Sequence, residues 1–284
     1  MKIVFFGTPE YVLPILKAIH KKFVTGPGKS PIAAVVTQSP KPVGRKQILS
    51  YSPIDKWAHE RNISTFYQSS ELAINNIEAD LGILAAYGEI IRKEVINLFP
   101  KGILVIHPSL LPKYRGASPI QAAIASGEET TGVSIIKMDE KVDHGAIVSQ
   151  FKENINQNDT TETLRAMLFE RSAEVITELI EPYMKGKITP REQNDAEATF
   201  TKLVTKQDGF IDLKKIDPED AERFIRAMSP WPSAWTLAEG KMIKLLKSHL
   251  EAGKLFLDEV QLEGKNPVKS REFETAYPQF SRLF

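Results

Sequence analysis

The chain contains no cysteine, and none of its apolar runs is long. Without cysteine there can be no disulfides, thiolate metal sites or cysteine nucleophiles, and we expect the reducing cytoplasm as the compartment. No run approaches the ~18–20 apolar residues that a membrane span needs. The opening MKIVFFGTPEY has a short apolar run without a small-residue cleavage site, which indicates a first strand rather than a secretion signal.

An excess of charge of one sign is also missing. The 37 Lys and Arg nearly balance the 36 Asp and Glu, so the net charge is +1. Broad nucleic-acid binding needs many excess cations, and any RNA contact would therefore be local. One candidate is the stretch 38–53, which contains Lys41, Arg45 and Lys46 and no acid. An ordinary solvated surface loop would explain the same composition.

The short motifs of several enzyme classes are absent. GxGxxG, GxxxxGK[ST], GxSxG and HExxH do not occur, so dinucleotide loops, triphosphate loops, serine hydrolases and zinc proteases are not indicated. The carboxylates at 139–143 have no second cluster of ligands elsewhere. We therefore predict no metal site.

The first part of the chain alternates between apolar runs and helix-like patterns. Continuous apolar runs, typical of strands buried on both faces, occupy residues 2–6, 33–37, 81–87 and 102–107. Helical spacing occupies residues 10–22, 53–61, 70–78 and 90–98. Further strands at 132–138 and 145–151 precede a long helix at 160–184. The alternation predicts an α/β fold with an open, mostly parallel, Rossmann-like sheet.

The composition changes after residue 184. Residues 185–204 are polar and rich in Gly, Pro, Asn and Asp, which indicates a linker. Residues 205–284 contain a short helical pattern at 218–228 and strand-like runs at 241–250 and 253–262. We predict three parts: an α/β domain at 1–184, a linker at 185–204 and a small β-rich domain at 205–284.

Candidate catalytic residues stand where predicted strands end. His107 ends the run in KGILVIHPSLLPKYRG, and ligands of open α/β sheets bind at the carboxyl ends of strands. Asp143 lies in the turn MDEKVDHG between two later strands. A histidine beside a carboxylate is a general acid/base arrangement. Spacing does not show that the two meet, and a strand-end histidine bonded to backbone or an aspartate capping its own turn are the alternatives.

Two long stretches resemble a known family. HPSLLPKYRGASPIQ (107–121) and TGVSIIKMDEKVDHG (131–145) are similar to the folate-dependent formyltransferases. The opening MKIVFFGTPEYVLPIL, the loop KPVGRKQILSYSPI and the late AMSPWPSAWT narrow the resemblance to the methionyl-tRNA formyltransferases. The resemblance implies formyl transfer from 10-formyltetrahydrofolate to the α-amine of methionine on initiator tRNA. It also implies a monomer.

The resemblance assigns roles to residues of this chain. His107 and Asp143 fall on the catalytic group, with the aspartate holding the histidine and favouring its protonated form. The folate site falls on the main chain of Ala86, Tyr87, Gly88 and Glu89 and on the loop Ser109, Leu110, Leu111 and Pro112. The tRNA-binding loop falls on Lys41, Arg45 and Lys46, with Arg45 its main arginine. A C-terminal β-barrel-like domain of OB type supplies further tRNA contacts.

The chain departs from the family at the catalytic group. The family has an asparagine two residues before the histidine, and here that residue is Val105. Loss of one oxyanion donor typically costs about 3–4 kcal/mol, or roughly 10²–10³ in rate. Three interpretations of Val105 remain open: a slower enzyme, an enzyme whose donor is supplied from elsewhere, and a folate- or tRNA-binding homologue without catalysis. For the second, one hypothesis is that His144, which replaces a threonine, supplies the donor. Transfer to an amino sugar or another small amine is a further alternative. The C-terminal domain is also shorter than the family's barrel.

Overall fold

The computed structural model describes residues 1–26, 28–44 and 47–283. Two of the predicted tRNA-binding residues, Arg45 and Lys46, lie outside these ranges. Contacts divide the chain into two units, which we describe separately. The first unit comprises residues 1–115, 132–152 and 166–199, and the second comprises 116–131, 153–165 and 200–284.

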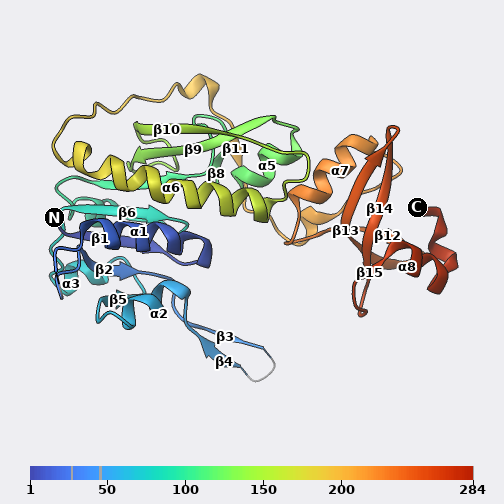
Figure 1. Cartoon of the computed structure of the whole chain (residues 1–284), viewed down its shortest axis with the longest axis horizontal. Helices are drawn as coiled ribbons and strands as arrows, with labels where there is room; N and C mark the ends of the chain where they lie inside the picture. The colour runs from blue at the N-terminus through green and yellow to red at the C-terminus, as the bar shows by residue number, and fades with distance from the viewer. Residues whose placement is uncertain (27, 45–46, 284) are drawn as a thin grey trace. The chain divides into compact units, whose positions relative to one another are not determined.

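The first unit is built on a seven-stranded sheet with the order β10-β9-β7-β6-β1-β2-β5 (Figure 1). Its strands are β1 (Ile3–Gly7), β2 (Ile32–Val36), β5 (Ser64–Phe66), β6 (Leu81–Ala85), β7 (Ile103–His107), β9 (Thr130–Lys137) and β10 (Ile147–Asn154). The five strands from β7 to β5 run parallel, and β9 pairs antiparallel with β7. The predicted mostly parallel α/β sheet is confirmed.

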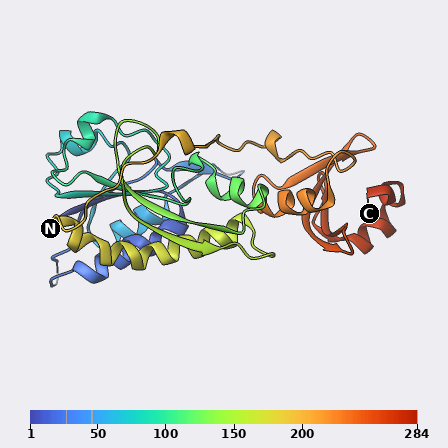
Figure 2. The same cartoon turned by 90° about the horizontal axis from the view of Figure 1, so that it is seen from above.

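Helices cover both faces of this sheet. The helical elements are η1 (Glu10–Val12), α1 (Leu13–Phe23), α2 (Pro53–His59), α3 (Glu71–Ile74), α4 (Lys93–Ile96) and α6 (Thr161–Met184). Figure 2 shows α1 and α6 on one side of the sheet and α3 and α4 on the other. Leu72 of α3 and Val95 of α4 pack in one cluster with Phe6 of β1. The sheet is thus buried on both faces, which explains why its strands are continuous apolar runs.

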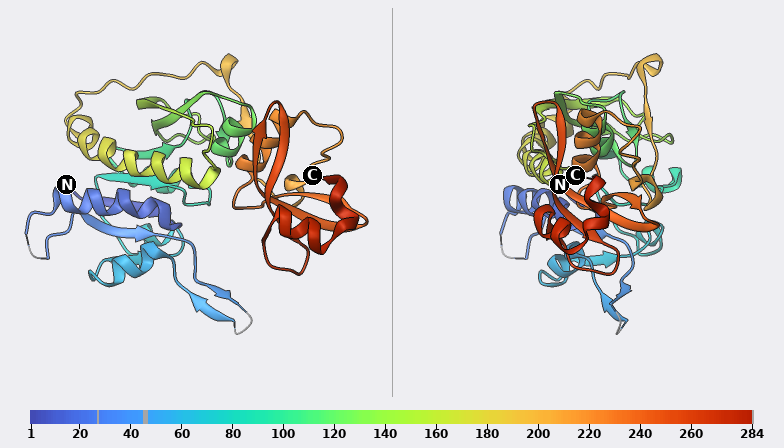
Figure 3. Two further views of the ribbon diagram at one scale, coloured as in Figure 1. Left: turned by 45° about the vertical axis from the view of Figure 1, so that its right-hand side comes forward. Right: turned by 90° about the vertical axis from the view of Figure 1, so that its right-hand side faces the viewer.

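Some local predictions are corrected by the structure. The helices predicted at 70–78 and 90–98 are single turns at Glu71–Ile74 and Lys93–Ile96. The stretch 38–53 contains a hairpin of β3 (Lys41–Val43) and β4 (Ile48–Ser50), which extends away from the sheet (Figure 3). All described residues of both strands are exposed. An exposed strand pair buries too little apolar surface to leave a pattern in the sequence.

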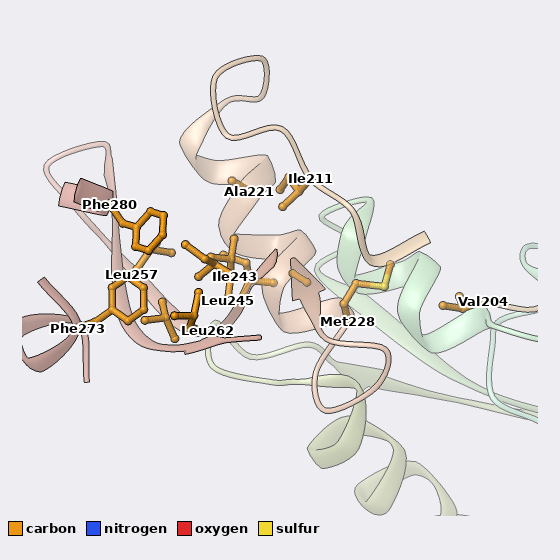
Figure 4. Close-up of a cluster of buried hydrophobic side chains, with 13 residues drawn as sticks. Val204, Ile211, Ala221, Met228, Ile243, Leu245, Leu257, Leu262, Phe273 and Phe280 are labelled. Atoms are coloured by element: carbon orange, nitrogen blue, oxygen red, sulfur yellow. The ribbon is translucent and has the colours of Figure 1, made fainter. Parts of the chain in front are cut away.

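The second unit contains a four-stranded antiparallel sheet of order β12-β13-β14-β15. Its strands are β12 (Ala234–Ala238), β13 (Lys241–Glu251), β14 (Lys254–Leu262) and β15 (Val268–Lys269), and its helices are α5 (Pro119–Ala125), α7 (Pro218–Ala227) and α8 (Ser270–Ala276). Ile243, Leu245, Leu257 and Phe273 belong to its buried core (Figure 4). In this sheet as described, β12 and β15 are edges, and a shortened barrel of OB type stays a prediction.

The stretch 185–204 is irregular but not without structure. It carries η2 (Asp195–Glu197) and β11 (Phe200–Thr201), while β8 (Arg115–Gly116), η3 (Gln207–Gly209) and η4 (Pro278–Leu283) are the remaining short elements. Figure 1 shows the chain leaving α6 and returning along the β9–β10 side of the sheet. Among the described residues, no helix is both long and apolar enough to span a membrane.

Candidate active site

The first unit gathers its polar site at one edge of the sheet. Gly7, Ala85 and His107 are the last residues of β1, β6 and β7, three neighbouring strands that run parallel. The chain proceeds from β1 outward to β2 on one side, and β6 and β7 continue on the other side. Such a reversal of strand order is where open α/β sheets place their ligands.

The structure brings His107 and Asp143 together. Nδ1 of His107 lies 3.4 Å from Oδ2 of Asp143, with 6% and 16% of their side chains exposed. Asp143 has a φ of 48°, in the left-handed region that a residue with a Cβ rarely adopts. This conformation occurs in the turn between β9 and β10, which we call the 139–145 loop. The pairing that spacing could not establish is therefore present.

The other ring nitrogen of His107 fixes the tautomer. Nε2 lies 3.0 Å from the carbonyl oxygen of Tyr114, which can only accept, so Nε2 carries a proton. Burial lowers the pKa of His107, while the Asp143 charge and the Tyr114 carbonyl act in the opposite direction. Asp143 thus favours the protonated ring as expected, but burial outweighs it. Nδ1 is the ring nitrogen that faces the Asp143 carboxylate.

The segment expected to contact the pterin leaves β6 at the same edge. Ala86 and Gly88 have φ values of 47° and 86°, so the chain bends sharply after the strand. The carbonyl of Tyr87 accepts from Thr8 Oγ1 at 3.2 Å and from Gln38 Nε2 at 3.3 Å. The buried Tyr87 hydroxyl donates to Glu89, and burial raises the pKa of Tyr87. The conformation of this segment is therefore held by its own Tyr87–Glu89 bond and by Thr8 and Gln38, which follow β1 and β2.

The 109–112 loop is held from within the same unit. The buried Ser109 hydroxyl donates to the Lys113 carbonyl at 2.7 Å. Ser134 on β9 accepts from the Leu111 N–H at 3.0 Å and donates to the Ser109 carbonyl at 2.7 Å. Gln150 on β10 donates to the Leu111 carbonyl at 3.1 Å. These bonds give the loop a defined shape directly after His107.

Val105 lies in apolar surroundings. It is on the same face of β7 as His107, two residues earlier, and 6% of its surface is exposed. The residues of its cluster are Leu111, Ile136 and Ile147, with Leu84 and Met138 packed against them. None of these side chains carries a hydrogen-bond donor. The cluster around Val105 therefore does not replace the missing amide.

The hypothesis that His144 supplies that donor is wrong for this conformation. Nδ1 of His144 lies 2.5 Å from Oδ2 of Asp139, and Nε2 lies 3.2 Å from Oδ2 of Asp195. Both ring nitrogens thus face carboxylates of the first unit rather than His107. A threonine at this position could not bridge two carboxylates in this way.

Sequence reasoning missed three residues that support the loops carrying His107 and Asp143. Gln193 donates to the carbonyls of Asp143 and Gly145, and Thr199 accepts from the Tyr114 N–H. Arg115 donates to Gln193 and Asp195. For Arg115, the sequence offered one sign of a role, its place in the triplet Tyr114–Gly116 that the family resemblance includes. Gln193 and Thr199 offered none, because they stand in a stretch whose composition indicates a linker.

In the described part of the predicted tRNA loop, the side chain of Gln38 reaches the segment that is expected to contact the pterin. Lys41, exposed on β3, donates to Gln38 Oε1 at 3.1 Å, and Gln38 in turn donates to the Tyr87 carbonyl.

For metals, the described ranges hold no group of three or more His, Cys, Asp or Glu side chains suited to binding an ion.

The comparison with family models settles the family. The formyl transferase model matches residues 1–180, and the model of the formyl transferase C-terminal domain matches residues 203–255. The chain belongs to the formyl transferase family. It is 38% identical to the methionyl-tRNA formyltransferase of Buchnera aphidicola subsp. Schizaphis graminum over 88% of this chain and 79% of that protein. It is 36% identical to the methionyl-tRNA formyltransferase of Methylacidiphilum infernorum over 96% of this chain and 94% of that protein.

Solved structures share the fold of this formyl transferase. The methionyl-tRNA formyltransferase from Clostridium thermocellum superposes with a TM-score of 0.63 at 19% identity, covering 92% of this chain and 98% of that one. WlaRD, a sugar 3N-formyl transferase solved with dTDP and 5-N-formyl-THF, gives a TM-score of 0.71 at 19% identity, with 94% and 99% covered. At these identities the likeness establishes the fold and leaves the substrate to be argued.

Proposed function

We propose that this formyl transferase transfers the formyl group of 10-formyltetrahydrofolate to the α-amine of methionine on initiator tRNA. The observation that carries the proposal is the His107–Asp143 pair at the carboxyl end of β7, in a chain whose curated relatives are methionyl-tRNA formyltransferases over most of its length. Cytoplasmic location and a monomeric state stay predictions.

His107 acts as the base at Nδ1. Its Nε2 proton is engaged by the Tyr114 carbonyl, so Nδ1 is the nitrogen that can accept a proton from the attacking amine. Asp143, 3.4 Å away, then stabilises the imidazolium by its opposite charge. The bond between the amine nitrogen and the formyl carbon forms, the bond from that carbon to the folate nitrogen breaks, and His107 returns the proton to the leaving nitrogen.

Stabilisation of the formyl oxygen is the weaker part of this site. Neutral His107 has its one N–H on the Tyr114 carbonyl, and Val105 has none to offer. Once Nδ1 holds the amine proton, it becomes a donor for the negative charge on that oxygen. We therefore propose a working enzyme that reacts more slowly than relatives with an asparagine at this position.

The folate co-substrate would bind along the bend at Ala86–Glu89 and the 109–112 loop. Both segments follow neighbouring parallel strands at the His107 edge, and both are held in shape by hydrogen bonds of this unit. The tRNA would be contacted by the β3–β4 hairpin, where Lys41 is exposed, and by Arg45 and Lys46 of the same stretch. We also propose that the second unit supplies further tRNA contacts.

The test is formyl transfer by purified protein to charged initiator tRNA, to methionine amide and to a dTDP-linked amino sugar. We expect transfer to methionyl-tRNA, reduced about 10²–10⁴-fold in His107→Ala as for loss of a general base. His59→Ala, which changes an exposed histidine of α2, serves as the matched control. Preferential transfer to the amino sugar would contradict the tRNA assignment, and normal folate binding without turnover on any amine would contradict an enzyme.

A further inference from the structure

The stretch 191–199 follows α6 in a region whose composition indicates a linker, yet it contacts both loops that carry the catalytic pair. We propose that residues 191–199 form a positioning element, in which Gln193 sets the place of Asp143 and Thr199 sets the place of the carbonyl that orients His107. The inference deepens the proposed function and rests on it. The contacts from which it is argued lie within the first unit.

Gln193 uses its whole amide group. Its Nε2 donates to the carbonyl of Asp143 at 2.9 Å and to that of Gly145 at 2.8 Å. Its Oε1 accepts from Nε and Nη2 of Arg115 at 3.1 and 2.8 Å. A flipped amide would set its oxygen against two carbonyls and its NH₂ against the guanidinium, so only one orientation is compatible with these partners. Asp143 and Gly145, on either side of His144, are thereby fixed together.

Arg115 anchors this amide from the loop that follows His107. Its side chain is 4% exposed, and Nη2 also donates to Asp195 Oδ1 at 2.7 Å. A buried guanidinium that is bonded to an amide and a carboxylate in this way has little freedom to move. His144 adds a second tie, because its ring bridges Asp139 of the 139–145 loop and Asp195 of the 191–199 segment.

Thr199 holds the other half of the pair. Its Oγ1 accepts from the Tyr114 N–H at 2.8 Å, and its carbonyl accepts from the Arg115 N–H at 2.8 Å. Tyr114 has a φ of 62°, and its carbonyl is the one that His107 Nε2 contacts. A left-handed conformation at a residue other than glycine persists only when its surroundings hold it. The same applies to Asp143, so the segment supports both unfavourable backbone positions.

The contacts of Gln193 and Thr199 indicate that these residues position the catalytic groups and do not bind substrate. Gln193 and Thr199 bond to the peptide groups of Asp143 and Tyr114, and neither is a catalytic residue in this scheme. Their loss should displace the two catalytic groups while the segments proposed to bind folate and tRNA keep their own hydrogen bonds. The expected signature is therefore a lower kcat with KM values close to those of the native protein.

The experiment compares Gln193→Ala and Gln193→Glu with Asn75→Ala. The glutamate keeps the shape and the bond to Arg115 but has no N–H for the two carbonyls. Asn75 is an exposed residue of the same unit outside the 191–199 segment, and its side chain donates to the Glu71 carbonyl at 2.8 Å. We expect kcat for methionyl-tRNA to fall about 10- to 100-fold in both Gln193 variants, as for a misplaced catalytic group, with both KM values within about twofold. Asn75→Ala should match the native protein.

A double variant decides whether Gln193 acts through Asp143. In an Asp143→Asn background, Gln193→Ala should lower kcat by less than about twofold, because the group it positions is already lost. A full further loss there, or unchanged kcat in the single Gln193 variants, would overturn the proposal.

A measurement that needs no turnover keeps the test independent of the proposed function. The His107 ring is titrated by NMR in native protein, Gln193→Ala and Asn75→Ala. Displacing Asp143 removes a charge that favours the protonated ring, so His107 should titrate at lower pH in Gln193→Ala alone. An inactive native protein that shows this shift would refute the proposed function but keep the positioning element, and the same titration in all three proteins would refute the element.

Discussion

Replacing Val105 with asparagine tests whether the apolar cluster beside His107 limits the rate. The side chain lies two residues before His107 on the same face of β7, so an amide there would lie at the edge of the reacting groups. Restoring one donor to an oxyanion is worth about 3–4 kcal/mol, or roughly 10²–10³ in kcat. We expect an increase of that order in formyl transfer to methionyl-tRNA.

The same substitution should destabilise the protein. Val105 is surrounded by Leu111, Ile136 and Ile147, and without substrate the new amide has no partner among them. Burying an unpaired amide lowers the free energy of unfolding by about 1–3 kcal/mol. The measurement is therefore a pair: single-turnover rates with saturating substrates, and thermal unfolding of the free protein. A faster but less stable variant is the expected outcome.

Val105→Asp is the matched control, because aspartate has nearly the shape of asparagine but no N–H to donate when ionised. It should lose stability without gaining rate. If Val105→Asn folds and binds folate as the native protein does, yet its rate is unchanged, the donor is already supplied from elsewhere and the slower-enzyme hypothesis fails.

Three further outcomes are expected from the geometry. Because burial lowers the pKa of His107 below 6.5 and protonation removes the base, kcat should be level at neutral pH and fall only on acidification. Asp143→Asn should move that fall to still lower pH. A fall near or above pH 7 in the native pH–rate profile would contradict the role of His107 as the base. Arg45→Ala should raise KM for tRNA without changing folate affinity by equilibrium binding, and unchanged tRNA kinetics would remove the hairpin's role. Gly88→Ala should lower the free energy of unfolding by about 1–3 kcal/mol in a denaturant titration, because φ is 86° and a Cβ would lie 2.6 Å from Gln38 Nε2; a neutral effect would show that this bend relaxes easily.

The central sheet was predictable because its signal is local. Each buried strand is a continuous apolar run, and runs such as 102–107 and 81–87 differ from the observed strands by no more than two residues at either end. The same apolar run made His107 visible, since the pattern ends on it. Asp143 was a candidate from its turn between two strands, but its pairing with His107 came from the family resemblance, and the structure shows that the two side chains meet.

The support of the site was not predictable, because it depends on contacts between distant parts of the chain. Gln193 lies 50 residues from Asp143, and Thr199 lies 85 residues from Tyr114. Polar residues in a stretch rich in Gly, Pro and Asn have the composition of a solvated connection, and nothing local distinguishes those that bond to a catalytic loop. The β3–β4 hairpin was missed for the opposite reason, since its exposed strands leave no burial pattern.

The path of the chain after α6 also bears on how the first unit can be divided. The helix ends at Met184, where composition suggests a natural cut, but the first unit continues to Thr199. A fragment that stops at residue 184 would keep His107 and Asp143 and every strand of the sheet while losing Gln193, Asp195 and Thr199. Such a fragment would carry the proposed catalytic side chains without the hydrogen bonds that hold them, and an inactive truncation of this kind would say nothing about whether the second unit is needed for catalysis.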